Sequence, residues 1–199
     1  FQRQNRLASA LIGQETPLYQ PLEITASFSG GQLIEQKDRT WLPNGGGNLI
    51  LRIENPVVQP VLLYCGNNFP ENARVYCNNQ LLNVYDDRLV RGIIDLGEQP
   101  AGTIEVRISL WQDGLWFNGL CACSLDTGRY DEWVGRMQSS AAETLTVAGT
   151  LVEGNVDAPR NGGLFTSIPC DNGWRVYVDG EPVKTSAAAG AFIAVPVSA

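Results

Sequence analysis

The sequence predicts an all-β fold of the β-sandwich or jelly-roll type, made of two related sheet halves that are bridged by one helix. Three observations lead to this prediction: short runs in which apolar and polar residues alternate, frequent Gly, Asn and Pro turn clusters between them, and a faint internal repeat. The chain has 199 residues, of which 44% are hydrophobic. A chain of this size buries roughly two-thirds of its surface, which suffices for one large or two small domains.

The clearest strand covers residues 102–110. Apolar residues stand at every second position of this run, at Ile104, Val106, Ile108 and Leu110. A period of two is typical of a strand with one buried and one solvated face. The same alternation recurs in residues 22–28, 48–55 and 174–179, and turn clusters lie at residues 29–31, 43–47, 55–56, 161–163 and 179–180. Short strands with frequent turns indicate a sandwich or a jelly roll.

One segment has the period of a helix instead. Between residues 129 and 142, apolar side chains recur three or four residues apart, at Tyr130, Trp133, Val134, Met137 and Ala141. Asp126 and Thr127 precede this segment and are suitable N-cap residues. We therefore expect a first β-sandwich at residues 1–124, a bridging helix at 125–143 and a second sandwich half at 144–199. One composite domain is the alternative.

The internal repeat has a period of 101 residues. A shift by 101 residues places Leu63-Tyr64 on Leu164-Phe165, residues 74–78 on 175–179, and Ile94 and Leu96 on Val195 and Val197. Two related sheet halves would produce this match, and so would the convergence of short β patterns. If the repeat is genuine, the first copy continues into the strand at residues 103–110, whereas the second copy reaches Ala199 at the point where the equivalent strand should begin. We then expect the second half to lack its last strand. The start at Phe1, without Met or a leader pattern, likewise predicts an excised fragment.

Composition excludes several classes of function. The chain has no His, which removes Ser-His-Asp and Cys-His catalysis, His-ligated zinc and imidazole pH sensing. Its 14 Lys and Arg residues are scattered and its net charge is −7, which argues against nucleic acid as a partner. The longest candidate for a membrane-spanning segment, residues 187–197, is interrupted by Gly190 and Pro196. We therefore expect that this chain has no membrane span and is a soluble fragment.

The five cysteines do not form a metal-binding pattern. They stand at positions 65, 77, 121, 123 and 170 without CxxC spacing. Cys121 and Cys123 share one face of a predicted strand but lack two further ligands at zinc-like spacing. We interpret the cysteines as small buried hydrophobic residues, and we predict neither a metal nor a cofactor.

Acidic motifs are better explained by local structure than by catalysis. Asp126-Thr127-Gly128 is the triplet of aspartic proteases, but it occurs once and opens the predicted helix. Glycoside hydrolysis requires two facing carboxylates. The sequence does not show that any two of its acidic residues face each other. The candidate carboxylates are Asp86, Asp87, Asp113, Asp131 and Glu132.

Aromatic residues are the best candidates for ligand contact, because their faces stack on sugar rings. We predict that Trp133 and Trp174 are core residues, since each lies on an apolar face. Residues 110–117 form a turn-bearing stretch with further aromatic residues, which could contact a ligand if they are exposed. The candidate glycan-binding residues are Trp111, Trp116, Phe117 and Trp41.

Residues 167–180 resemble a motif of the YfhO family of bacterial polytopic membrane proteins. That family carries Ser-Ile-Pro-Tyr-Asp-x-Gly-Trp-x-Val-x-Val-Asp-Gly near its C-terminus, and here only Cys170 replaces the usual Tyr. Weaker matches are residues 94–97, 100–102 and 125–126, so the resemblance covers roughly residues 48–199. We interpret the motif as a folding signature. Its residues are Pro169, Asp171, Gly173, Trp174, Val176, Val178, Asp179 and Gly180.

The resemblance implies an outward-facing β-sandwich attached to a many-helix membrane body of the glycosyltransferase C type. Such proteins are thought to move a sugar from an undecaprenyl-phosphate carrier to a cell-wall polymer such as teichoic acid. The acidic catalytic residue of the family belongs to the membrane body, and no position here matches it. The expected function is therefore a non-catalytic extracytoplasmic module that positions or binds a wall glycan, with its own transmembrane body as partner. A free-standing carbohydrate-binding or glycoside-cleaving sandwich and a purely structural brace are the alternatives.

Overall fold

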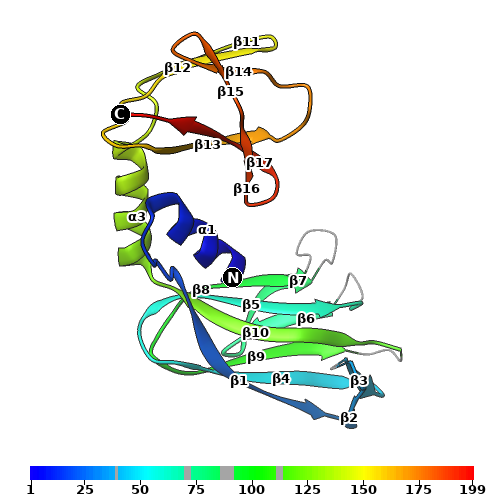
Figure 1. Cartoon of the computed structure of the whole chain (residues 1–199). Helices are drawn as coiled ribbons and strands as arrows, with labels where there is room; N and C mark the ends of the chain where they lie inside the picture. Colours follow the sequence, from blue (N-terminus) through cyan, green and yellow to red (C-terminus); the bar gives the residue numbers. More distant parts are fainter. Residues whose placement is uncertain (39, 70–72, 86–91, 111–113) are drawn as a thin grey trace. The chain divides into compact units, whose positions relative to one another are not determined.

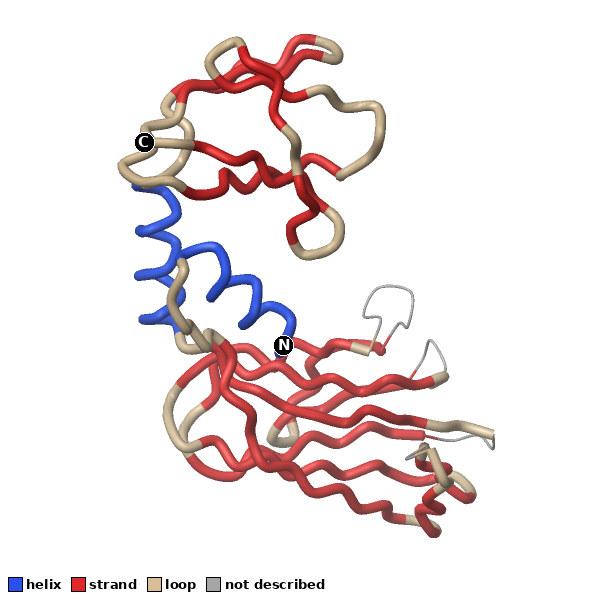
Figure 2. Tube along the Cα trace, in the orientation of Figure 1, coloured by secondary structure: helices blue, strands red, loops and turns tan. Residues whose placement is uncertain are grey.

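The chain divides into two compact units that are rich in strands. The computed structural model describes residues 1–38, 40–69, 73–85, 92–110 and 114–199. Unit 1 comprises residues 1–5 and 17–130, and unit 2 comprises residues 6–16 and 131–199. Antiparallel strands, labelled in Figure 1 and drawn red in Figure 2, dominate each unit, which confirms the all-β fold class.

Unit 1 is a sandwich of two antiparallel layers. One layer contains β10 with β1, β3 and β5 beside it and β8 beyond β5, and the other has the order β1-β4-β9-β6-β7. The short β2 extends the edge at β3. The strands are β1 (Tyr19–Ser29), β2 (Gln32–Glu35), β3 (Trp41–Asn44), β4 (Gly47–Asn55), β5 (Gln59–Asn67), β6 (Ala73–Cys77), β7 (Gln80–Tyr85), β8 (Ile93–Gln99), β9 (Gly102–Leu110) and β10 (Phe117–Leu125).

The predicted alternation produces the core of unit 1. In β4 and β9 every second side chain is buried, and the pairing of the two strands brings Leu51 opposite Val106. The residues between them face outward, where Arg52 and Glu105 form a salt bridge of 3.2 Å. The inward residues join one hydrophobic cluster with those of β5, β6, β8 and β10. Burial of these apolar side chains, at about 1.5–3 kcal/mol each, stabilises the sandwich.

Strand β1 belongs to both layers. Residues Tyr19–Leu22 pair with β10, whereas residues Glu23–Ser29 pair with β4. The start of β4 needs glycine, because a Cβ atom on Gly47 would clash with the carbonyl oxygen of Ser29 at the end of β1. This close approach explains the last glycine of the turn at residues 43–47.

Unit 2 consists of helical segments and three small antiparallel sheets. The sheets pair β11 with β12, β14 with β15, and β17 with both β13 and β16. The strands are β11 (Thr144–Ala148), β12 (Leu151–Asn155), β13 (Gly162–Pro169), β14 (Val176–Val178), β15 (Glu181–Val183), β16 (Ser186–Ala188) and β17 (Phe192–Val197).

The prediction of one helix is wrong, because the chain has a second one near its start. The expected helix is α3 (Thr127–Ser139), and the Arg129 backbone N–H donates to the Asp126 carboxylate over 3.0 Å, which confirms Asp126 as N-cap. The missed helix is α1 (Gln2–Ile12), which ends before Gly13 at a φ of 67°. Within unit 2, Trp133 donates its indole N–H to the carbonyl oxygen of Ala8 over 3.2 Å. None of the helices in the described residues is long and apolar enough to cross a membrane.

The register of paired strands supports the internal repeat. Strand β5 pairs with β8 as β13 pairs with β17, and the residue pairs correspond after a shift of 101 residues. In unit 1 the pairs are Leu62 with Asp95, Leu63 with Ile94 and Tyr64 with Ile93. In unit 2 they are Gly163 with Pro196, Leu164 with Val195 and Phe165 with Ala194.

The hairpins that follow show the same correspondence. Tyr76 pairs with Leu81 in β6–β7, and Tyr177 pairs with Pro182 in β14–β15. Both turn residues have positive φ in each hairpin, with 48° and 68° at residues 78 and 79 and 52° and 84° at residues 179 and 180. Positive φ at both positions is the mark of a type I′ hairpin turn. The register agrees for the two residue pairs nearest the turn, and a β-bulge between Val75 and Tyr76 in unit 1 ends the correspondence. The shared register and turn type favour a true repeat over the convergence of short β patterns.

The two units differ in how well their cores are covered. The buried hydrophobic residues of unit 2, all of whose residues the structure describes, are Ala8, Ile193 and Val195. Trp174 is 37% exposed, so the prediction that it is a core residue is wrong for this structure. The physical reason is that β14 pairs with β15 alone, which leaves the other side of the hairpin without a neighbouring strand.

Candidate functional site

Two of the predicted aromatic residues, Trp41 and Phe117, lie together at one end of unit 1. Trp41 on β3 pairs with Phe117 at the start of β10, and their rings stack with centroids 6.3 Å apart and planes inclined by 12°. Phe117 is completely buried and also contacts Phe69 at a centroid distance of 6.3 Å. Phe117 is therefore removed from the candidate sugar-contacting residues, and it acts as the base on which the half-buried Trp41 rests.

Trp116 is held next to this stack by its backbone. The Trp116 N–H donates to the Asn68 side-chain oxygen over 2.7 Å, and the Trp116 carbonyl accepts from the Asn68 N–H over 3.3 Å. The Asn68 amide nitrogen also donates to the carbonyl of Gly114 over 3.1 Å. The Trp116 side chain is half-buried, so a fixed backbone presents a partly accessible indole. We call Trp41 and Trp116 together the aromatic end of unit 1.

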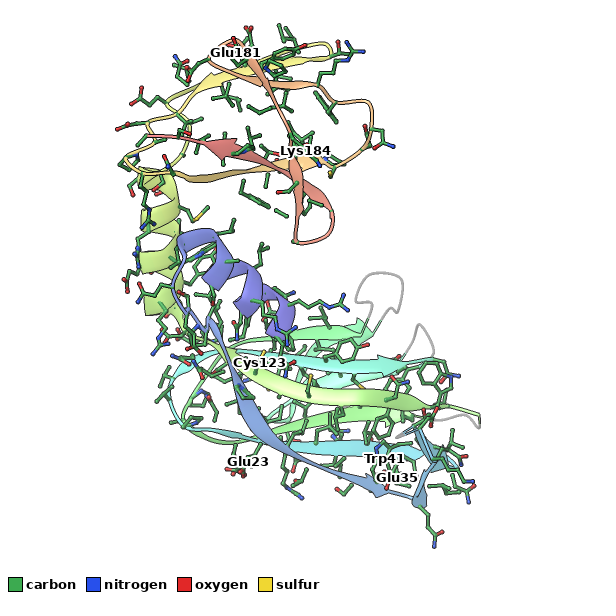
Figure 3. The ribbon with its side chains drawn as sticks, viewed as in Figure 1. Glu23, Glu35, Trp41, Cys123, Glu181 and Lys184 are labelled. Atoms are coloured by element: carbon green, nitrogen blue, oxygen red, sulfur yellow. The ribbon has the colours of Figure 1, made fainter. Side chains whose placement is uncertain are left out.

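Two carboxylates belong to the hairpin that carries Trp41. Glu35 on β2 pairs with Trp41 in register, and Figure 3 labels both residues at this edge of the sheet. In the turn between β2 and β3, hydrogen bonds from the Thr40 side chain and backbone hold the pKa of Asp38 below its usual range. Carboxylates and asparagine amides beside an aromatic ring are the groups that bind sugar hydroxyls.

Other predicted candidates are placed differently or fall outside the described residues. Trp111, Asp86, Asp87 and Asp113 lie outside the described residues. Asp131 and Glu132 are exposed on α3. Within the part of the chain that the structure describes, no group of three or more Cys, Asp and Glu side chains could hold a metal ion.

The cysteines divide into two groups. Cys65, Cys77 and Cys123 are buried, as expected for small hydrophobic residues, whereas Cys121 and Cys170 are exposed, which contradicts that interpretation for these two. Burial raises the pKa of the Cys65 thiol to about 12. A thiol with this pKa is protonated at neutral pH and is not a nucleophile.

The motif at residues 169–180 has a structural explanation at several of its positions. Pro169 pairs with Phe192 at the end of β13, and the Asp171 carboxylate accepts a hydrogen bond of 2.7 Å from the Gly173 N–H. Asp179 and Gly180 form the turn between β14 and β15. Val176 and Val178 are half-buried on one face of that hairpin.

A second aromatic surface in unit 2 was not predicted from the sequence. A shallow cleft of about 260 Å³ lies on the β14–β15 hairpin. Its lining combines aromatic, aliphatic and polar side chains, from Trp174, Arg175, Val176, Tyr177, Pro182, Val183 and Thr185. The outward position of Tyr177 in the alternating run was the one signal that could have indicated it.

Comparison with known proteins assigns the chain to a family. The family model described as bacterial membrane protein YfhO matches residues 1–199, the whole chain. No curated protein and no solved structure shows a significant match. The match agrees with the resemblance seen in residues 167–180 and extends it over both units. The chain therefore belongs to the YfhO family of bacterial membrane proteins.

Proposed function

We propose that this chain is a non-catalytic extracytoplasmic module of a YfhO membrane protein, and that it binds or positions a cell-wall glycan beside the membrane body. In this proposal the transmembrane body of the same protein is the partner and carries out glycosyl transfer. Membership of a bacterial membrane protein family supports the attachment. The lack of His supports a module that binds rather than reacts, since acyl-transfer and zinc chemistry most often use imidazole.

The observation that carries the binding role is the aromatic end of unit 1. The Trp41 indole rests on the buried Phe117 ring, and the Trp116 backbone is fixed through Asn68, so less of this surface has to be ordered when a ligand arrives. Preorganised aromatic groups lower the entropic cost of binding. Neighbouring carboxylates and amides supply the hydrogen bonds that flat stacking alone lacks.

The purely structural brace is the second candidate. A brace is favoured when all tryptophans are buried, whereas both residues of the aromatic end are partly accessible. These two indoles therefore favour a binding module over a brace.

Isothermal titration calorimetry with glycosylated glycerol-phosphate oligomers tests the proposal, and unglycosylated oligomers separate sugar recognition from phosphate recognition. We expect binding to the glycosylated oligomer and a loss of affinity of about tenfold in Trp116→Ala, which corresponds to about 1.4 kcal/mol. Trp133→Phe is the matched control, because Trp133 lies on α3 in unit 2. Absence of heat with the unmodified chain, or equal affinity in Trp116→Ala, would contradict the binding role.

A further inference from the structure

The repeat shows which strands have an equivalent in both units. Helix α1 precedes β1 and helix α3 precedes β11, and in each unit the next long strand, β4 or β12, pairs antiparallel with that first strand. Strand β13 then corresponds to β5, β14 to β6, β15 to β7 and β17 to β8. The hairpin β2–β3 is replaced in unit 2 by the short turn between β11 and β12.

Besides β2 and β3, two strands of unit 1, β9 and β10, have no equivalent in unit 2, and both are central. Strand β9 lies between β4 and β6, with residue pairs along the whole of β4. Strand β10 lies between β1 and β5. In unit 2, every residue of which is described, β12 pairs with β11 alone, β14 with β15 alone and β13 with β17 alone. One strand position is thus open between β12 and β14, and a second between β11 and β13.

Burial differs between the units next to these open positions. Ile94 on β8 and its equivalent Val195 on β17 are 7% and 6% exposed. Strand β8 pairs with β5 as β17 pairs with β13, and β17 has β16 as an additional partner. By contrast, Val75 is buried beside β9, whereas its equivalent Val176 is half-buried. The exposed Trp174 stands at the position of the fully buried Ala73. The open strand position beside β14 therefore accounts for the exposure of Trp174 and for the incomplete burial of Val176.

We propose that unit 2 accepts two further strands at these positions, supplied by the polypeptide that continues from β17, in the order and register of β9 and β10. The connection in unit 1 supports supply from the same chain, because only residues 100 and 101 separate β8 from β9. The first strand to enter would carry apolar residues at alternate positions, as β9 does, and would cover Trp174, Val176 and Val178. Paired strands would also satisfy the free backbone groups along β12 and β14. The proposal is independent of glycan binding by unit 1.

A fusion protein tests this assignment. Residue 199 is equivalent to residue 98, so a copy of residues 99–125 is joined directly to Ala199. The matched control carries the same copy with Ile104→Ser, Val106→Ser and Ile108→Ser, which removes the apolar alternation and keeps the length. Hydrogen exchange measured by mass spectrometry reports on β12 and β14, and exchange in β4 verifies that unit 1 is folded.

We expect amide exchange in β12 and β14 to slow at least tenfold in the fusion and to stay unchanged in the control. A synthetic peptide of residues 102–110, added to the unmodified chain, provides a second measurement that does not depend on folding of the fusion. Failure of both the fusion and the peptide to protect β12 and β14 would overturn the proposal. Protection that rises with the concentration of the unmodified chain would identify a second copy as the occupant and would overturn supply from the same chain.

Discussion

Equivalent positions of the two units provide a matched test of how far each core is covered. Val75 on β6 is 2% exposed and belongs to the hydrophobic cluster of unit 1, whereas Val176 on β14 is half-buried. The substitutions Val75→Ala and Val176→Ala each remove two methyl groups from equivalent residues of a repeated hairpin, of which Val75 adjoins a β-bulge. A difference in their effect reports on how well each side chain is covered.

The expected cost at Val75 follows from its burial. Loss of two buried methyl groups costs about 1.6 kcal/mol in transfer free energy, and a residual cavity adds about 1 kcal/mol. We therefore expect Val75→Ala to lower the free energy of unfolding of unit 1 by about 2–3 kcal/mol. At Val176 solvent already reaches the side chain and no closed cavity forms, so the expected loss is about 1 kcal/mol or less.

Hydrogen exchange of the slowest amides in each unit measures these losses separately. A loss of about 2 kcal/mol accelerates exchange in β6 and β9 by about 30-fold, and a loss below 1 kcal/mol accelerates exchange in β14 by less than about fivefold. Equal acceleration at both sites would refute the reasoning, because it would mean that Val176 is as well covered as Val75.

Three further predictions concern thiols and a helix cap. A thiol reagent at pH 8 should modify Cys121 and Cys170 in the native chain and should modify the other three thiols only after denaturation. Fast modification of Cys65 in the native chain would contradict its burial. Because the pKa of Cys65 is raised to about 12, its contribution to stability is complete below pH of about 9 and is lost as the pH rises towards 12. The urea midpoint should therefore fall between pH 8 and pH 11, and an unchanged midpoint would contradict the shift. Asp126→Ala should cost about 1 kcal/mol by circular dichroism melting, whereas Asp131→Ala, which removes an exposed acid from the same helix, should have little effect.

Alternation in the sequence was sufficient to predict three strands of unit 1, namely β1, β4 and β9. The buried positions of β4 and β9 are those with apolar residues at every second site, because one face of each strand meets the opposite layer. The tight turn at Asp179 and Gly180 was predictable for a similar reason, since few residue pairs accept two positive φ angles. These features depend on local chemistry, which a single sequence contains.

The remaining features depend on neighbours that a sequence does not specify. Helix α1 escaped notice because its first turns are polar and its apolar stripe is short, with Leu7 and Leu11 as its main members. Alternation assigns Trp174 to the inward face of its strand, but it cannot indicate whether another strand covers that face. The turn-bearing stretch before Phe117 predicts an exposed position for this residue, whereas its ring is buried next to Trp41 on the paired strand.

Strand β1 has a mechanical consequence for unit 1. Its first four residues are bonded to β10 and its last seven to β4, so one continuous backbone ties both layers together. Separation of the layers would require β1 to detach from at least one of them along its full paired length. Stretching or heating unit 1 should therefore rupture it in a single step, with no stage at which one layer persists without the other.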